Sequence, residues 1–186
     1  MQQRKQLTLI YGFVSMIGVL IILTAVWYFN KDARYNKYKD YQDRFAIKYP
    51  ASWSYGVNEN NAEVVFYSPV ENDLDYFREN LNIVIQDNSL KNLNIVEYTN
   101  LAIKQLEVVF KANLKIIESN DLVINNREGH RLVFEGYGDN IEYKFLTVWL
   151  LDGAQVYQIT YTSLKSNYDK YVGHVEKMVS SFRIDH

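Results

Sequence analysis

A short acidic segment is the strongest candidate for chemistry in this sequence. It reads VENDLDYFREN and contains four carboxylates, Glu71, Asp73, Asp75 and Glu79. Calcium prefers several oxygen ligands from a flexible segment, which makes these residues candidate calcium ligands. The segment lacks the central glycine and the ligand spacing of an EF-hand loop. A solvated acidic loop that binds no ion is therefore the alternative interpretation.

A second and weaker acidic cluster lies further along the chain. It comprises Glu135, Asp139 and Glu142 around Gly136 and Gly138. Turn formation alone accounts for the two glycines, because glycine accepts backbone angles that other residues avoid. No cofactor is predicted from either cluster beyond the calcium of the first.

Aromatic side chains next to the acidic segment are candidates for partner contact. The chain has 16 tyrosines, and tyrosine is favoured at protein interfaces because it combines a large rigid area with a polar tip. Most of them are expected in the core or on sheet faces. Tyr67, Tyr76 and Phe77 belong to the expected loop, so we identify them as contact candidates.

Motifs for covalent chemistry are missing from the sequence. The absence of cysteine excludes disulfides, thiolate metal sites and cysteine nucleophiles. His130, His174 and His186 are far apart and have no HxH or HxxxH partner, and no GxSxG, Walker or GxGxxG motif occurs. We expect no catalytic residues and a protein that is not an enzyme.

The charge balance argues against nucleic acid as a partner. Arg4 and Lys5 precede the long apolar segment, and the chain after it carries the remaining 18 basic residues against 22 acidic ones. Nucleic-acid binding depends on a positive surface, which a net negative domain does not predict.

Residues 7–29 predict a transmembrane anchor. This stretch contains no charged side chain, and it is longer than the roughly 20 residues that cross a bilayer. It ends in Trp27, Tyr28 and Phe29, whose rings favour the headgroup region, and bulky aromatics do not suit a cleaved signal peptide. The expected organisation is a tail (1–6), the anchor (7–29), a juxtamembrane linker (30–42) and one globular domain (43–186).

Two arguments about the orientation of the anchor point in opposite directions. Four basic residues, Lys31, Arg34, Lys37 and Lys39, follow the anchor and only two precede it, which favours a cytoplasmic domain. Long domains translocate despite such charges. We expect a single-pass protein of the cell membrane with an extracytoplasmic domain, on the family resemblance given below.

Hydrophobic periodicity predicts an α+β domain in which helices pack on an antiparallel sheet. Alternation or β-rich composition indicates strands near 45–49, 64–68, 81–87, 114–118, 129–137, 143–151 and 154–162. The strand at 143–151 is apolar on both faces and must be covered on both sides.

Helices are predicted at 95–112 and from about 168 to 182, with capping boxes at Asn94/Glu97 and Ser166/Asp169. Tyr35, Tyr38 and Tyr41 are spaced by three, which indicates a helical extension over 30–44 or an irregular linker.

Three stretches of the chain resemble the PsbP family, which comprises the extrinsic protein of photosystem II and its bacterial relatives. They are DRFAIKYPASW at 43–53, FYSPVENDLDYFRENLNIVIQD at 66–87, and VYQITYTSLKSNYDKYVGHVEKMVSSF at 156–182. Their order and spacing fit the family, and together they cover essentially residues 41–184. The resemblance implies an α/β/α sandwich, in agreement with the α+β pattern.

The resemblance also implies a role. It suggests a non-catalytic accessory domain outside the cytoplasm that binds a membrane protein complex; in photosynthetic lineages it supports the oxygen-evolving centre and its retention of calcium and chloride. Plant members carry a cleaved transit peptide and many cyanobacterial ones a lipid-bearing cysteine, whereas this chain has an apolar anchor. Two alternatives stay open: a photosystem II assembly or stabilising factor, and a calcium- or small-ligand-binding protein or enzyme subunit.

Overall fold

The computed structural model describes residues 34–138 and 140–185. The predicted tail, the predicted anchor and the first part of the predicted linker lie outside these residues. Over the two described ranges, no helix is long and apolar enough to cross a membrane.

Strands dominate the described chain. They are β1 (Tyr35–Lys39), β2 (Phe45–Pro50), β3 (Ser54–Glu59), β4 (Ala62–Tyr67), β5 (Asn80–Asp87), β6 (Lys115–Ile124), β7 (Arg127–Gly138), β8 (Ile141–Asp152), β9 (Gln155–Leu164) and β10 (Arg183–Ile184). The helices are α2 (Ile95–Phe110), the short 3₁₀ helix η1 (Lys111–Asn113) and α3 (Tyr168–Ser181).

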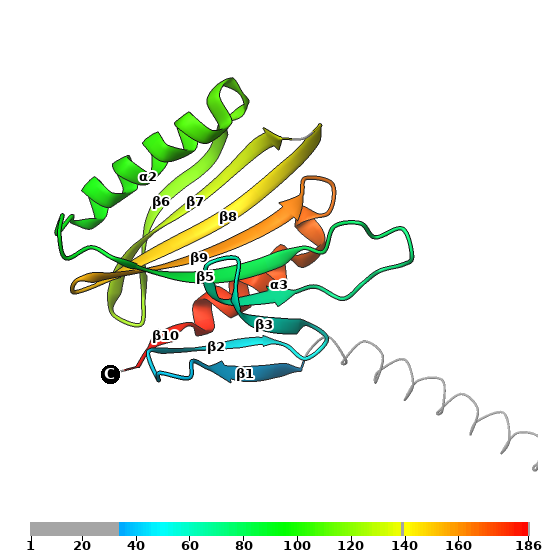
Figure 1. The fold of residues 1–186 in the computed structure, drawn as a ribbon, viewed down its shortest axis with the longest axis horizontal. Helices are drawn as coiled ribbons and strands as arrows, with labels where there is room; N and C mark the ends of the chain where they lie inside the picture. The colour runs from blue at the N-terminus through cyan, green and yellow to red at the C-terminus, as the bar shows by residue number, and fades with distance from the viewer. Residues whose placement is uncertain (1–33, 139, 186) are drawn as a thin grey trace, which may run out of the picture.

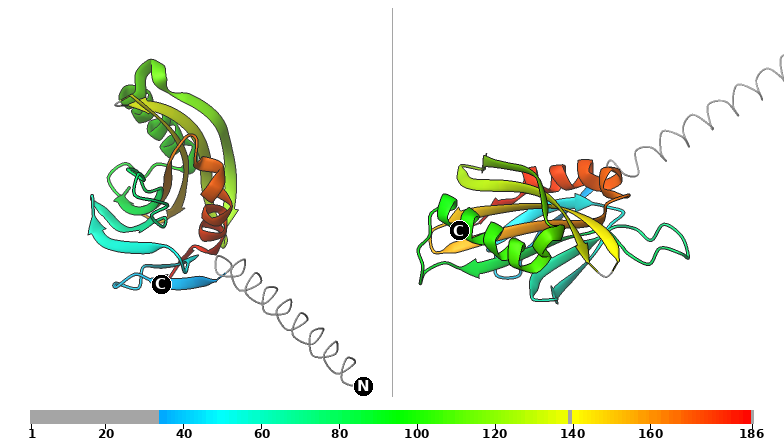
Figure 2. Two further views of the ribbon diagram at one scale, coloured as in Figure 1. Left: turned by 90° about the vertical axis from the view of Figure 1, so that its right-hand side faces the viewer. Right: turned by 90° about the horizontal axis from the view of Figure 1, so that it is seen from above.

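The main sheet has seven strands in the order β3-β4-β5-β9-β8-β7-β6, and every pair is antiparallel (Figure 1). Helices α2 and α3 lie on its opposite faces (Figure 2). The predicted α+β class with antiparallel strands and two helices is confirmed.

Strand β8 shows how the two faces are divided. Leu146, Val148 and Leu150 join the buried cluster that α3 covers. Phe145 and Trp149 point the other way, into the cluster beneath α2. Since successive side chains of a strand alternate between faces, a strand apolar at every position requires two covers, as predicted.

A small second sheet corrects the expected linker. It has the order β1-β2-β10, and Tyr38 of β1 pairs with Ile47 of β2. The helical extension predicted over 30–44 is therefore wrong for Tyr35–Lys39. Pairing with β2 supplies the backbone hydrogen bonds of this stretch. Tyr38 is buried while Tyr41 is exposed, so the three-residue tyrosine spacing does not mark one helix face.

One of the two predicted capping boxes forms. Asn94 accepts from the Glu97 amide, and the Glu97 carboxylate accepts from the Asn94 amide, each at 3.0 Å. The Ser166/Asp169 box is wrong, because α3 begins at Tyr168 and its N-cap residue Asn167 makes no capping side-chain bond. The Asn167 amide donates instead to Glu79, at 3.1 Å.

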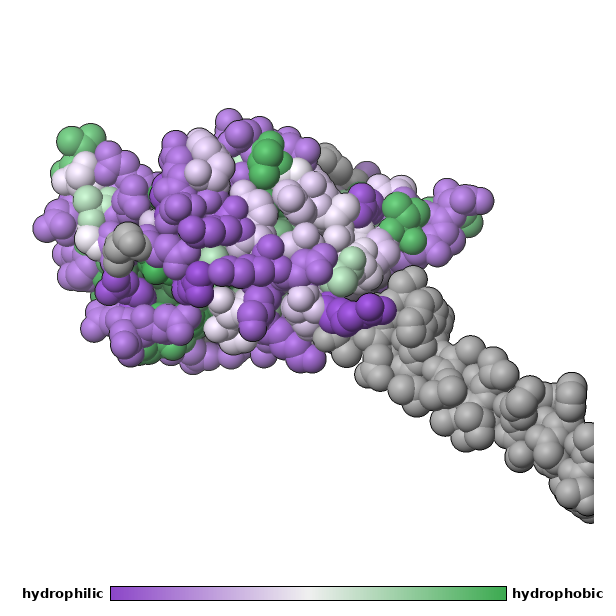
Figure 3. Space-filling model, turned by 90° about the horizontal axis from the view of Figure 1, so that it is seen from below, coloured by the Kyte–Doolittle hydropathy of each residue, from purple (hydrophilic) through white to green (hydrophobic). Residues whose placement is uncertain are grey.

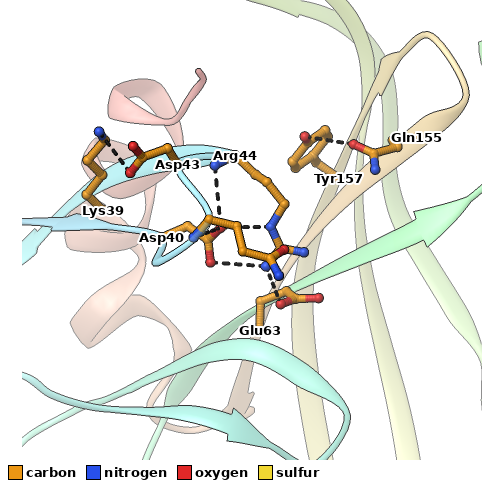
Figure 4. A network of polar contacts seen from close by, with 8 residues as sticks. Lys39, Asp40, Asp43, Arg44, Glu63, Gln155 and Tyr157 are labelled. Carbon is orange, nitrogen blue, oxygen red and sulfur yellow. Dashed lines mark hydrogen bonds and ion pairs between the residues drawn. The ribbon is translucent and has the colours of Figure 1, made fainter. Parts of the chain in front are cut away.

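An ion network joins the turn between β1 and β2 to the main sheet (Figure 4). Arg44 donates from Nε to Asp40 Oδ2 at 2.7 Å and from Nη2 to Asp40 Oδ1 at 3.0 Å. The same Nη2 donates to Glu63 of β4 at 2.5 Å. Asp40 is only 2% exposed, so Arg44 supplies a bidentate partner to a buried carboxylate.

Candidate functional site

The candidate site is the 68–79 loop, which connects β4 to β5 and projects from one end of the molecule (Figure 1). Its tip is organised by local hydrogen bonds. Asn72 accepts from the Leu74 amide at 2.9 Å through its side chain and from the Asp75 amide at 3.0 Å through its carbonyl. Asp75 in turn accepts from the Glu71 amide at 3.0 Å. This loop therefore has a defined turn at its tip.

Arg78 fastens the base of the loop to the sheet. Its Nε donates to the Ser68 carbonyl at 2.7 Å, and its Nη2 donates to Ser54 Oγ at 2.9 Å. The guanidinium also lies 5.2 Å from the ring centre of Tyr67, whose hydroxyl donates to Glu59 at 2.7 Å. Tyr67, one of the predicted contact residues, is thus half-buried and held by intramolecular partners.

Two of the four candidate carboxylates bind the loop to α3. Glu71 lies 2.5 Å from Lys170 Nζ and accepts from the Tyr171 hydroxyl at 2.9 Å. The Lys170 hydrogen bond lowers the pKa of Glu71 against the opposing effect of burial. Glu79 is buried, with its carboxylate facing the Asn167 amide and the Ser68 hydroxyl.

The exposed residues of the loop include apolar and aromatic ones beside the polar Glu71, Asn72 and Asp73. Leu74 is 85% exposed, Tyr76 is 77% exposed, and Val70 is also exposed. Phe77, by contrast, is half-buried and packs against Tyr143, with ring centres 5.4 Å apart. Figure 3 shows hydrophobic atoms on the projecting loop, which is otherwise surrounded by hydrophilic surface. Of the predicted contact residues, only Tyr76 is presented to solvent.

A groove of about 470 Å³ runs beside Tyr76. It is lined further by Asn140 and the start of β8, and by the end of β9 with the segment that follows it: Asn140, Ile141, Glu142, Leu164, Lys165 and Ser166. Lys165 Nζ lies 3.2 Å from Glu135 and 3.5 Å from Glu142, so it is an ion-pair partner of two members of the second acidic cluster. The third member, Asp139, lies outside the described residues.

The arrangement offers little to a metal ion. Across residues 34–138 and 140–185, no group of three or more His, Cys, Asp or Glu side chains could hold one. Glu71 and Glu79 already have protein partners on α3 or next to it, which leaves Asp73 and Asp75 at the tip.

We therefore expect calcium to leave the stability of the protein almost unchanged. A site with a dissociation constant near 0.1 mM would stabilise the folded state by about 2.7 kcal/mol at a hundredfold excess of calcium. Thermal unfolding of the full-length protein in mild detergent, with 10 mM calcium against 10 mM magnesium, should give melting temperatures that agree within about 1 °C. A calcium-specific rise that Glu79→Gln abolishes would restore the calcium hypothesis.

His130 has partners that sequence reasoning missed. Its Nδ1 lies 2.7 Å from Asp121 Oδ1, and its Nε2 lies 2.8 Å from Ser119 Oγ. The signal was the two-residue turn at 125–126, because an antiparallel hairpin closed there puts position 121 opposite 130. His174 lies on α3 with its Nδ1 2.8 Å from the Tyr35 hydroxyl, and His186 is outside the described residues.

Comparison with known proteins matches the PsbP family over residues 33–184. The chain belongs to the PsbP family. Members of the PsbP family are generally non-catalytic. The match begins before β1, which places that strand inside the PsbP domain and not in a linker. No curated protein matches the chain.

Solved structures share the PsbP fold. The solution structure of cyanobacterial PsbP (CyanoP) from Synechocystis sp. PCC 6803 has a TM-score of 0.61 at 18% identity, covering 81% of this chain and 92% of that one. LpqN of Mycobacterium tuberculosis, involved in cell envelope biogenesis, has a TM-score of 0.64 at 7% identity, covering 82% and 91%. The Ran-binding protein Mog1p of Saccharomyces cerevisiae has a TM-score of 0.56 at 8% identity, covering 81% and 95%. At these identities the likeness extends to the fold alone.

Proposed function

We propose that this PsbP-family protein is a membrane-anchored accessory module that docks on a membrane-associated protein complex through the 68–79 loop, a role that needs no catalysis. One observation carries the proposal: the loop turns Glu71 and Glu79 toward α3 and presents Leu74 and Tyr76 to solvent. Exposed Leu74 and Tyr76 would be covered on docking, which is favourable because exposing apolar surface costs free energy.

The chemistry of the loop defines the partner that would fit it. Leu74 and Tyr76 are suited to fill an apolar pocket, since a few central anchors supply most of the energy of an interface. Asp73 and Asp75 flank Leu74, so the pocket should have a basic rim. The same carboxylates oppose insertion into an anionic lipid surface, which favours a protein partner.

The predicted anchor restricts where that partner lies. Five residues, 30–34, separate the apolar segment from β1, and they reach at most about 17 Å when extended. β1 begins at the end of the molecule from which the 68–79 loop projects (Figures 1 and 2). A loop at that end would face the bilayer, where it could meet the part of a complex that emerges from the membrane.

The side of the membrane is proposed from the family resemblance. An extracytoplasmic domain is the expectation for a PsbP relative, although the basic residues after the anchor favour the cytoplasmic side. The proposal places the domain outside the cytoplasm.

Co-purification tests the proposal. Full-length protein with an affinity tag, extracted from its native membranes in mild detergent, should recover a stoichiometric membrane partner. The same protein without residues 1–29 should recover much less, because the anchor raises the local concentration of the partner. Recovery of photosystem subunits would identify the photosystem II alternative. Repeated isolation of the protein alone, under conditions that keep known complexes intact, would contradict docking.

A further inference from the structure

Ser119, His130 and Asp121 form a hydrogen-bonded chain on the edge of the main sheet. Ser119 and Asp121 lie two residues apart on β6, so their side chains share one face. His130 on β7 is the direct partner of Asp121 in the ladder. Its ring lies between the two, 2.7 Å from Asp121 Oδ1 and 2.8 Å from Ser119 Oγ.

The order of these contacts fixes the role of each atom. Ionised Asp121 can only accept a hydrogen bond, so Nδ1 of the neutral imidazole must carry the proton. Nε2 is then the acceptor and receives the Ser119 hydroxyl proton. This arrangement matches a nucleophile, a base and an orienting acid.

The surroundings hold the imidazole in place and leave the serine accessible. His130 is buried and stacks on Trp149, with ring centres 5.5 Å apart and planes 19° apart. Trp149 is itself fixed by its Nε1, which donates to Thr99 of α2 at 3.0 Å. Ser119 is exposed on the edge strand. The base is therefore pre-oriented, while a substrate can approach the hydroxyl.

We propose that Ser119 is an activated nucleophile that takes acyl groups from carboxylic esters. Ser119 Oγ attacks the ester carbonyl carbon, and its proton passes to His130 Nε2. The carbon–oxygen bond to the alcohol breaks, and the alkoxide leaves with that proton. Water, deprotonated by the same Nε2, then attacks the acyl-serine, releases the carboxylic acid and restores the hydroxyl. Asp121 keeps the imidazole in its tautomer and stabilises the transient imidazolium.

The surface around Ser119, His130 and Asp121 limits which substrates would fit. An open groove of about 540 Å³ is lined by Asp121 together with Ile95, Leu122, Val123, Glu128 and Gly129, and Ser119 lies two residues from Asp121 along β6. Its apolar residues suit an aliphatic or aromatic group, and its two carboxylates disfavour an anionic substrate. The oxyanion that forms at exposed Ser119 would be solvated by water, which suits activated esters and not amides. Neutral or cationic esters with good leaving groups are therefore the expected class.

This activity is independent of the docking proposed above. β6 is the edge strand of the main sheet furthest from β4 and β5, which carry the 68–79 loop. Variants of either site can thus be made without altering the other.

A fluorophosphonate probe provides the test, because it reacts with the same activated hydroxyl. Full-length protein in mild detergent is incubated with the probe, and peptide mass spectrometry locates the adduct. We expect modification at Ser119 and none in Ser119→Ala. Asp121→Asn should slow labelling at least about a hundredfold, the lower end of the range for general-base assistance. Hydrolysis of p-nitrophenyl acetate should fall in parallel.

Asp169→Asn on α3 is the matched control, since it removes one exposed carboxylate by the same substitution and should label at the wild-type rate. Melting temperatures of all variants separate loss of reactivity from loss of folding. The proposal would be overturned if folded protein gave no adduct at Ser119, or if wild type and Asp121→Asn were labelled equally. The hydrogen bonds among Ser119, His130 and Asp121 would then serve only to stabilise the edge strand β6.

Discussion

Replacing Leu74 by Asp and Tyr76 by Ala is expected to abolish recovery of the membrane partner while leaving the protein folded. Both side chains lie almost wholly in solvent, at 85% and 77% exposure, so their loss should change the free energy of unfolding by no more than about 0.5 kcal/mol. If they are the anchors of the interface, each should contribute about 2 kcal/mol or more to binding, or roughly thirtyfold in affinity. Quantitative co-purification of the tagged full-length variants measures the loss.

Leu90 supplies the matched control. It is 97% exposed in the loop between β5 and α2, so Leu90→Asp makes the same chemical change away from the 68–79 loop. Partner recovery should be unaffected in this variant. If Leu90→Asp loses the partner and the Leu74 and Tyr76 variants keep it, the docking surface has been assigned to the wrong loop.

Arg44→Met is expected to cost the protein about 3 kcal/mol of stability, because it leaves the Asp40 carboxylate buried without its partner. Asp40 is 2% exposed and receives two hydrogen bonds from Arg44, while Glu63 holds the guanidinium from the other side. For a domain of about 150 residues this lowers the melting temperature by roughly 10 °C. Thermal unfolding of the full-length protein in mild detergent gives the value.

The control for this prediction is the neighbouring exposed pair. Lys39 Nζ lies 2.9 Å from Asp43, but both side chains are well exposed, at 48% and 70%. Such pairs contribute little, so Lys39→Met should change stability by less than about 1 kcal/mol. Equal losses in the two variants would mean that burial of Asp40 is not what makes the Arg44 network stabilising.

The pH dependence of the Arg44→Met effect has a definite sign. Burial opposes ionisation of Asp40, but the hydrogen bonds and charge of Arg44 outweigh it and hold the pKa of Asp40 below its ordinary value. The network therefore stabilises the protein fully above the unfolded pKa, near 3.9, and the contribution disappears as pH falls through the lower folded pKa. In Arg44→Met burial acts alone and raises the pKa of Asp40, so the difference in stability between wild type and the variant should be largest near pH 7 and narrow as the pH falls toward 4.

Much of the fold could be predicted from the pattern of hydrophobic residues in the sequence. The apolar side chains on both faces of residues 143–151 predicted a strand covered on both sides, and Leu146 and Trp149 do face different helices. The Asn94/Glu97 pair correctly marked the start of α2, since both of its hydrogen bonds are local in sequence. Features that depend on neighbouring residues are those that the sequence predicts well.

The errors concern features that depend on distant partners. Tyr35, Tyr38 and Tyr41 resemble a helix face, yet the stretch forms β1 because β2 offers it a ladder. β3 was not predicted, since SYGVNE has little apolar alternation and is stabilised by pairing with β4. The Ser166 cap failed because Asn167 is used to hold Glu79, which lies 88 residues away in the chain.

In the candidate site, too, local features could be predicted and those that depend on distant residues could not. The 68–79 loop was identified from composition, but which of its residues face solvent is decided by α3 through Lys170 and Tyr171. The contacts of His130 with Ser119 and Asp121 depend on the hairpin register between β6 and β7. Without that register the three residues gave no recognisable motif.

The small sheet has a consequence for the order in which the chain is made. Its middle strand, β2, is synthesised before the main sheet, whereas its partner β10 follows the main sheet and α3 in the chain. Until Arg183 pairs with Ala46 and Phe182 reaches Phe45, a growing chain carries an open strand edge beside an uncovered aromatic ring. Such an edge can pair with other chains. The growing chain is therefore open to pairing with other chains until β10 has been made.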